Sequence, residues 1–69
     1  MGKRTMVTVR LTGGNHDEAR KMLKALGYEE SIIVSILNGE PIYMELSRAD
    51  TFVSMMKRLT NSRMEIAAA

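Results

Sequence analysis

The chain has 69 residues, a formal net charge of +2 from ten basic and eight acidic residues, and no cysteine. A chain of this length forms one domain and buries only about 60% of the surface that its unfolded form exposes, so any core is small. The lack of cysteine excludes disulfides, thiolate nucleophiles and cysteine-based zinc sites. No apolar stretch approaches the ~20 residues of a membrane helix, so we expect no membrane partner.

The two ends of the chain carry no targeting signal that we recognise. The first residues, MGKRT, contain two positive charges but are not followed by the apolar segment of a secretory signal, which favours a cytoplasmic protein. Ala67, Ala68 and Ala69 resemble the alanine run that a cloning vector adds to an insert, and we leave them out of the functional reasoning. Residues 1–69 are treated as a single domain.

The first expected element is a strand over residues 5–11. Val7, Val9 and Leu11 alternate with Met6, Thr8 and Arg10, the pattern of a strand that is buried on one face.

A helix is expected next, with Asn15 as its cap and Glu18 three positions later to complete a capping box. Gly27 suits the left-handed position that ends many helices. The apolar stripe of this helix consists of Ala19, Met22, Leu23 and Leu26.

A β-hairpin is expected in the middle of the chain. Residues 31–37 are rich in β-branched side chains, residues 41–47 alternate, and Asn38 and Gly39 lie between them as turn residues. A two-residue loop would place the more apolar side of residues 31–37 on the open face of the sheet. We therefore favour a three-residue loop with Gly39 in a bulge, which turns that side toward the core. The resulting pairs are Ile36 with Glu40, Val34 with Ile42, and Ile32 with Met44.

The last two expected elements are a helix and a short strand. Ser47 and Asp50 match a capping box for the helix, and Asn61 and Ser62 end it. Its apolar stripe consists of Ala49, Phe52, Val53, Met56 and Leu59. Residues 63–66 alternate again and predict the strand.

The predicted order of strand, helix, strand, strand, helix, strand is the split βαβ arrangement of ferredoxin-like domains, an α+β fold. Right-handed connections then place two helices on one face of a four-stranded antiparallel sheet with strand order 4-1-3-2. This architecture hosts many unrelated functions, so function has to be argued from sites.

The glycine pair before the first helix is the first candidate site. Gly13, Gly14, Asn15 and His16 could present backbone N–H groups to an anion or a small ligand, which suggests a ligand-sensing dimer as one alternative. The segment lacks the third glycine of a dinucleotide fingerprint and the ending of a P-loop, and the acids that follow it repel phosphate. We therefore interpret it mainly as a strand-to-helix connection.

Catalysis and metal binding are not indicated. His16 has no second histidine or cysteine to share a metal ion with it, and the serines have no other conventional base. We expect no enzyme, no catalytic residue, no metal and no cofactor.

Binding to another protein is the favoured function. The expected open sheet face has exposed apolar side chains, and the expected edge strand, residues 31–37, has no charge to prevent pairing with another strand. We predict a small regulator, adaptor or inhibitor that binds another protein or itself as a homodimer. The predicted contact residues are Met6, Arg10, Ile33, Ser35, Leu37, Tyr43 and Glu45.

Nucleic-acid binding is the runner-up to protein binding, ahead of the ligand-sensing dimer. Lys3, Arg4 and Arg10 cluster near the first strand and could contact a phosphate backbone. The charges are nearly balanced over the chain, however, and the aromatic pattern of RNA-recognition motifs is absent.

Overall fold

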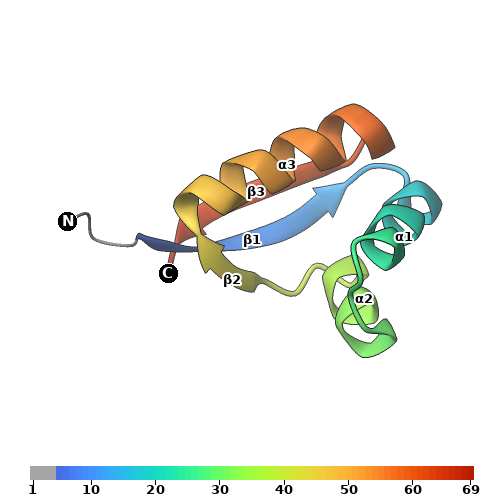
Figure 1. Cartoon of the computed structure of the whole chain (residues 1–69), viewed down its shortest axis with the longest axis horizontal. Helices are drawn as coiled ribbons and strands as arrows, with labels where there is room; N and C mark the ends of the chain where they lie inside the picture. The colour runs from blue at the N-terminus through green and yellow to red at the C-terminus, as the bar shows by residue number, and fades with distance from the viewer. Residues whose placement is uncertain (1–4) are drawn as a thin grey trace.

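The computed structural model describes residues 5–69 as an α+β domain with three strands and three helices (Figure 1). The strands form one antiparallel sheet in the order β2-β1-β3. The elements in chain order are β1 (Met6–Gly13), α1 (His16–Ala25), α2 (Glu30–Leu37), β2 (Ile42–Glu45), α3 (Leu46–Thr60) and β3 (Arg63–Ala68).

The central strand, β1, confirms the alternation expected at the start of the chain. Val7, Val9 and Leu11 are buried on the face that the helices cover. The four-residue β2 pairs with only the first half of β1, from Met6 to Val9, whereas β3 pairs with it from Val7 to Gly13. The turn after α2 lies beside the other half, because a Cβ on Gly39 would be 3.6 Å from the carbonyl oxygen of Leu11.

The helix expected after Asn15 is confirmed as α1. The Asn15 side chain accepts a hydrogen bond from the Glu18 N–H at 3.1 Å, so it caps the helix as predicted. Ala19 and Leu23 are buried and Met22 packs beside them, while Leu26 at the C-cap is largely exposed.

The predicted four-stranded ferredoxin-like sheet is wrong, because residues 31–37 lie in α2 and not in a strand. The hairpin and its three cross-strand pairs are therefore absent. Met44 pairs instead with Val7, and Ile42 with Val9. The β-branched composition of this segment was misleading, since its two buried residues, Ile33 and Ile36, follow helical spacing and not alternation.

Gly39 ends α2 by a Schellman motif, not by a hairpin turn. Its φ is 86°, its N–H donates to the Ile36 carbonyl, and the N–H of Glu40 donates to the Ser35 carbonyl, both at 3.0 Å. The same motif ends α1 at Gly27, where φ is 94° and a left-handed stop was predicted correctly. Asn followed by Gly suits both kinds of turn, so local sequence does not distinguish them.

The helix expected from Ser47 begins one residue earlier, and the predicted capping box is wrong. The strand β2 runs directly into α3, with Glu45 at the N-cap position and no side-chain cap. Ser47 lies inside the first turn, and its hydroxyl donates to Glu45 Oε1 at 2.8 Å. Asn61 ends the helix with a φ of 53°, as predicted.

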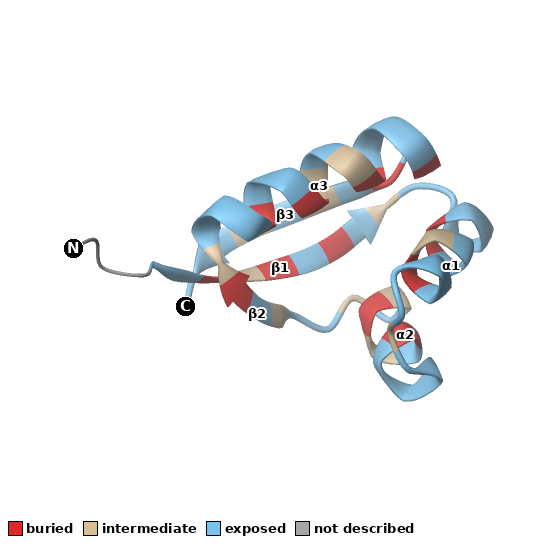
Figure 2. Ribbon diagram, viewed as in Figure 1, coloured by how far each residue is buried: buried red, intermediate tan, exposed pale blue. Residues whose placement is uncertain are grey.

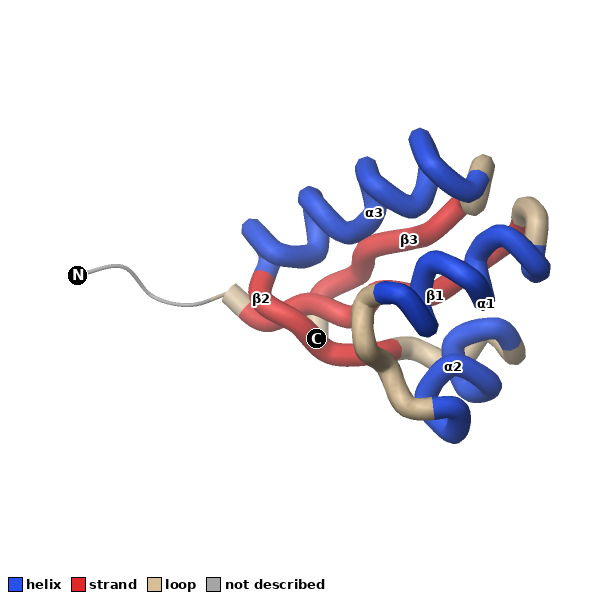
Figure 3. Tube along the Cα trace, turned by 45° about the vertical axis from the view of Figure 1, so that its right-hand side comes forward, coloured by secondary structure: helices blue, strands red, loops and turns tan. Residues whose placement is uncertain are grey.

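The core lies between the sheet and the helices, and all three helices contribute to it (Figures 2 and 3). Ala49, Phe52 and Met56 bury the inner face of α3. Leu59, which was predicted to belong to the same stripe, is 55% exposed, and Thr60 is buried in its place.

The C-terminal alanines take part in the sheet. Ala67 lies opposite Thr8 and Ala68 opposite Val7, so β3 extends beyond the predicted strand of residues 63–66.

Candidate functional site

The predicted contact residues do not form one surface. Ile33 is 1% exposed and belongs to the core, and Leu37 packs against it. Ser35 also lies in α2, so none of these three residues is on a sheet face, and this part of the predicted surface is wrong. Met6 and Tyr43 are 49% and 69% exposed, as an interaction surface requires.

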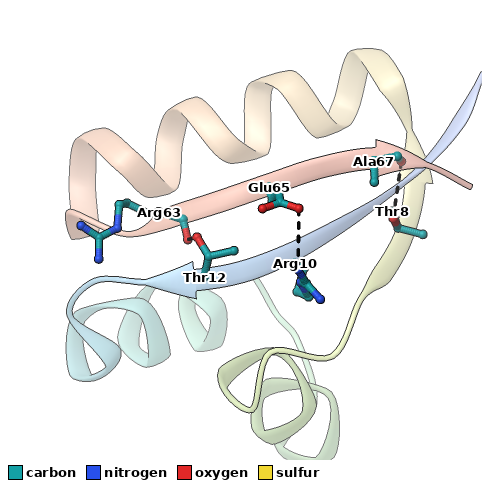
Figure 4. Close-up of polar contacts among 6 residues, drawn as sticks. All are labelled: Thr8, Arg10, Thr12, Arg63, Glu65 and Ala67. Atoms are coloured by element: carbon teal, nitrogen blue, oxygen red, sulfur yellow. Dashed lines mark hydrogen bonds and ion pairs between the residues drawn. The ribbon is translucent and has the colours of Figure 1, made fainter.

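The remaining predicted residues lie on the uncovered face of the sheet, which is polar along β1 and β3 (Figure 4). Thr8 Oγ1 donates to the Ala67 carbonyl at 3.4 Å. The guanidinium of Arg10 lies 3.6 Å from the Glu65 carboxylate. These cross-strand contacts occupy polar side chains that a partner on this face would otherwise bind.

The basic cluster proposed for nucleic acid is described only in part. Lys3 and Arg4 lie outside the described residues, and the charge of Arg10 is offset by its neighbour Glu65. Nucleic-acid binding therefore stays a prediction.

The segment from Gly13 to His16 is explained by packing. Gly14 has a φ of 113°, and a Cβ there would lie 2.5 Å from the Asn61 carbonyl oxygen and 2.6 Å from Ser62 Cα. Glycine is needed because the connection from β1 to α1 touches the turn between α3 and β3. With Asn15 already engaged as a cap, binding of a ligand at this segment stays a prediction.

His16 is exposed at the first position of α1. Within residues 5–69, no three His, Asp or Glu side chains come close enough together to hold a metal ion.

Two hollows lie between α3, the end of α1 and the outer edge of β2. One hollow of about 380 Å³ is lined by Leu26, Gly27, Tyr28, Arg48, Thr51, Phe52 and Met55. A second of about 640 Å³ is lined by Met6, Tyr28, Ile32, Ile42, Tyr43, Met44, Glu45 and Arg48. Because Tyr28 and Arg48 line both hollows, the two adjoin, and we call the combined surface the Arg48 groove.

Apolar side chains form the walls of the Arg48 groove. The ring of Tyr28 packs edge-on against Phe52 with their centroids 6.3 Å apart, which fixes one wall to the core. Ile32 projects from α2 and is 40% exposed, and Met55 is half-buried on α3. An exposed apolar surface of this kind on a small domain is typical of a binding site.

The groove has two charged side chains: Arg48 supplies the positive charge, and Glu45, which accepts a hydrogen bond from Ser47, lines the second hollow with it. The Arg48 side chain is exposed on the first turn of α3, and within residues 5–69 it forms no ion pair. A guanidinium between two apolar hollows can form paired hydrogen bonds with a carboxylate.

The edge of β2 adds backbone groups to the groove. The Leu46 N–H donates to the Thr5 carbonyl at 2.8 Å, in line with the register of β1 and β2. Hydrogen-bonded and non-bonded pairs alternate along an antiparallel ladder, so Ile42 and Met44 bond to β1. Tyr43 then directs its N–H and carbonyl outward, toward the groove.

Sequence reasoning found Met6, Tyr43 and Glu45 but missed most of the groove. It singled out neither Arg48 nor Tyr28, because the contact of the turn after α1 with α3 is a tertiary feature.

Comparison with protein-family models, curated proteins and solved structures finds no match for this chain. None of the helices in residues 5–69 combines the length and the apolar character needed to cross a bilayer.

Proposed function

We propose that this protein is a small interaction module that binds an extended segment of another protein in the Arg48 groove. The observation that carries the proposal is the position of Arg48 where two apolar hollows meet beside an outward-facing backbone. The module acts by covering its partner and contributes no chemistry of its own.

The chemistry of the partner follows from the lining of the groove. Its side chains must be apolar where they meet Tyr28 and Ile32, and a carboxylate must reach Arg48. An extended segment also offers backbone groups to Tyr43, as in recognition by strand addition. The partner is thus an extended segment with apolar residues around one Asp or Glu.

A random peptide library selected on the immobilised protein tests this proposal. We expect the selected peptides to combine apolar residues with an acidic one. Measured by fluorescence polarisation, their affinity should fall at least about tenfold for Arg48→Glu, because the substitution replaces attraction by repulsion. Arg48→Lys, which keeps the charge, should lose less.

The matched control is Lys57→Glu, which makes the same charge change on the far side of α3. Lys57 is exposed and lies in neither hollow, so peptide affinity should be unchanged. Peptides that bind the Arg48→Glu and Ile32→Asp variants as well as the original protein would refute the groove as the site. Selection of no peptide at all would count equally against the proposal.

A further inference from the structure

The second edge of the sheet, β3, lies on the opposite side of the molecule from the Arg48 groove. The backbone groups of the odd-numbered residues of β1 form hydrogen bonds with β2, so those of the even-numbered residues form hydrogen bonds with β3. The hydrogen-bonded pairs between β1 and β3 are therefore Thr8 with Ala67 and Arg10 with Glu65. Met64, Ile66 and Ala68 therefore direct their backbone N–H and carbonyl groups outward. An edge of this kind can pair with another strand.

A stripe of α3 borders this edge. Leu46, Asp50, Val53 and Lys57 are spaced four, three and four positions apart, so they share one side of the helix. The opposite side, with Arg48, Thr51 and Met55, faces the end of α1 across the groove. α3 lies along β3 (Figure 1). Because the stripe is on the side of the helix opposite Arg48, Thr51 and Met55, we infer that it faces away from α1, toward the outer edge of β3.

The stripe carries opposite charges around a small apolar centre. Asp50 and Lys57 are exposed, and neither forms an ion pair within residues 5–69. Val53 lies between them and is half-buried. When two such helices run antiparallel, Asp50 of one faces Lys57 of the other, and Val53 lies near its own copy. The stripe therefore complements itself.

We propose that two copies of this chain form a two-fold symmetric dimer through β3 and α3. The β3 strands pair antiparallel with Ile66 opposite Ile66 of the second copy, and Asp50 of each copy faces Lys57 of the other. The sheet becomes a continuous six-stranded one, with both α3 helices on the same face. This contact is independent of the Arg48 groove and leaves it open.

The charge pattern of β3 selects this register. Centring the axis on Ile66 pairs Met64 with Ala68 of the second copy, so the pairs formed by residues 64–68 all lie within the strands. A shift by one position toward the start of β3 places Glu65 opposite Glu65, and like charges in direct opposition are unfavourable. A shift by one position the other way places Glu65 opposite Ala69, which lies beyond β3, and so shortens the ladder. A shift to Met64 runs the pairing into Ser62, which is 1% exposed in the turn before β3.

The strand and helix contacts agree on the position of the axis. Ile66 lies about 10 Å along β3 from Arg63, at roughly 3.3 Å per residue. The same distance back along α3 from Thr60 is about seven residues at 1.5 Å each, which reaches Val53. Val53 is also the centre of the Asp50 and Lys57 pattern. One two-fold axis therefore satisfies both elements.

Analytical ultracentrifugation over a range of concentrations tests the dimer. We expect the original chain to change from monomer to dimer as its concentration rises. Lys57→Glu brings a second carboxylate against Asp50 at two symmetric places and should raise the dissociation constant at least about tenfold. The double variant Asp50→Lys with Lys57→Glu reverses both charges and should restore association.

Arg48→Glu is the matched control, because it makes the same change on the groove side of α3 and should leave the mass unchanged. Far-UV circular dichroism of each variant checks that the exposed substitutions leave the fold intact. A monomer at every concentration would overturn the inference. A dimer that Lys57→Glu does not weaken, or that the double variant does not restore, would also overturn it. None of these results affects peptide binding at the Arg48 groove.

Discussion

At the scale of single residues, Gly14 shows how a tertiary contact decides what a local pattern means. The sequence marks the glycine pair as a connection between a strand and a helix. The structure adds a reason, since the Gly14 Cα lies against the backbone of Asn61 and Ser62, far along the chain. No local pattern contains this contact, so sequence reasoning could place the glycine but not explain it.

Replacing Gly14 by alanine should lower the free energy of unfolding by about 3 kcal/mol or more, because strain at positive φ adds to an overlap with backbone atoms that cannot move aside. Gly27→Ala is the control: its φ is 94°, but a Cβ there would meet nothing within 4 Å. It should cost only the left-handed strain, about 1 kcal/mol. Urea unfolding measures both. If the two substitutions lowered the free energy of unfolding equally, the close contact of residue 14 with the Asn61 backbone would not add to the cost.

The buried pair of hydroxyls at Thr60 and Ser62 allows a second residue-scale prediction. Thr60 Oγ1 donates to the Met56 carbonyl, so its 2.5 Å contact with Ser62 Oγ requires the serine to donate. Ser62→Ala removes one hydrogen bond and should cost about 1 kcal/mol. Thr60→Val leaves the buried serine without its acceptor and should cost more, about 2 kcal/mol. The opposite order in thermal unfolding would contradict this assignment of donors.

At the scale of elements, sequence patterns predicted the helices and strands that are marked by a local cap or by alternation. They failed where one pattern is typical of both a hairpin and a capped helix. Both expected helices and the strands β1, β2 and β3 occur close to their predicted places. The segment before Gly39 failed because β-branched residues followed by Asn and Gly describe a hairpin as well as a capped helix. Its helical form depends on what packs against Ile33 and Ile36, and on the Schellman bonds at Gly39.

Two alanine substitutions in α2 distinguish the helix from the predicted strand. In the helix Ile33 is 1% exposed and Val34 is 44% exposed, whereas the predicted hairpin buried Val34. Ile33→Ala should therefore lower the free energy of unfolding by about 2–4 kcal/mol. Val34→Ala should change it by less than about 0.5 kcal/mol, since it loses little burial and gains helix propensity. A larger loss at Val34 in chemical denaturation would support the strand.

At the scale of the whole molecule, one core joins all the elements. Val9 of β1, Leu23 of α1, Ile36 of α2 and Met56 of α3 are each at most 1% exposed and belong to one cluster. From the length of the chain we expect a free energy of unfolding of about 3–10 kcal/mol. No element packs against a second core that would keep it folded on its own. The groove and the β3 edge therefore depend on the packing of the same cluster.

Unfolding should consequently be a single cooperative transition. Tyr28 packs against Phe52, and the chain has only two tyrosines, so Tyr43→Phe leaves Tyr28 as the only tyrosine. Tyr43 is 69% exposed, and its substitution should leave stability nearly unchanged. In that variant, loss of the Tyr28 near-UV signal and loss of helix signal in the far UV should share one denaturation midpoint. The comparison is made in the dilute Lys57→Glu background, so that association does not displace the midpoint. Helix signal that persists after the Tyr28 signal is lost would contradict a single transition, because helices would then remain after the contact between Tyr28 and Phe52 is broken.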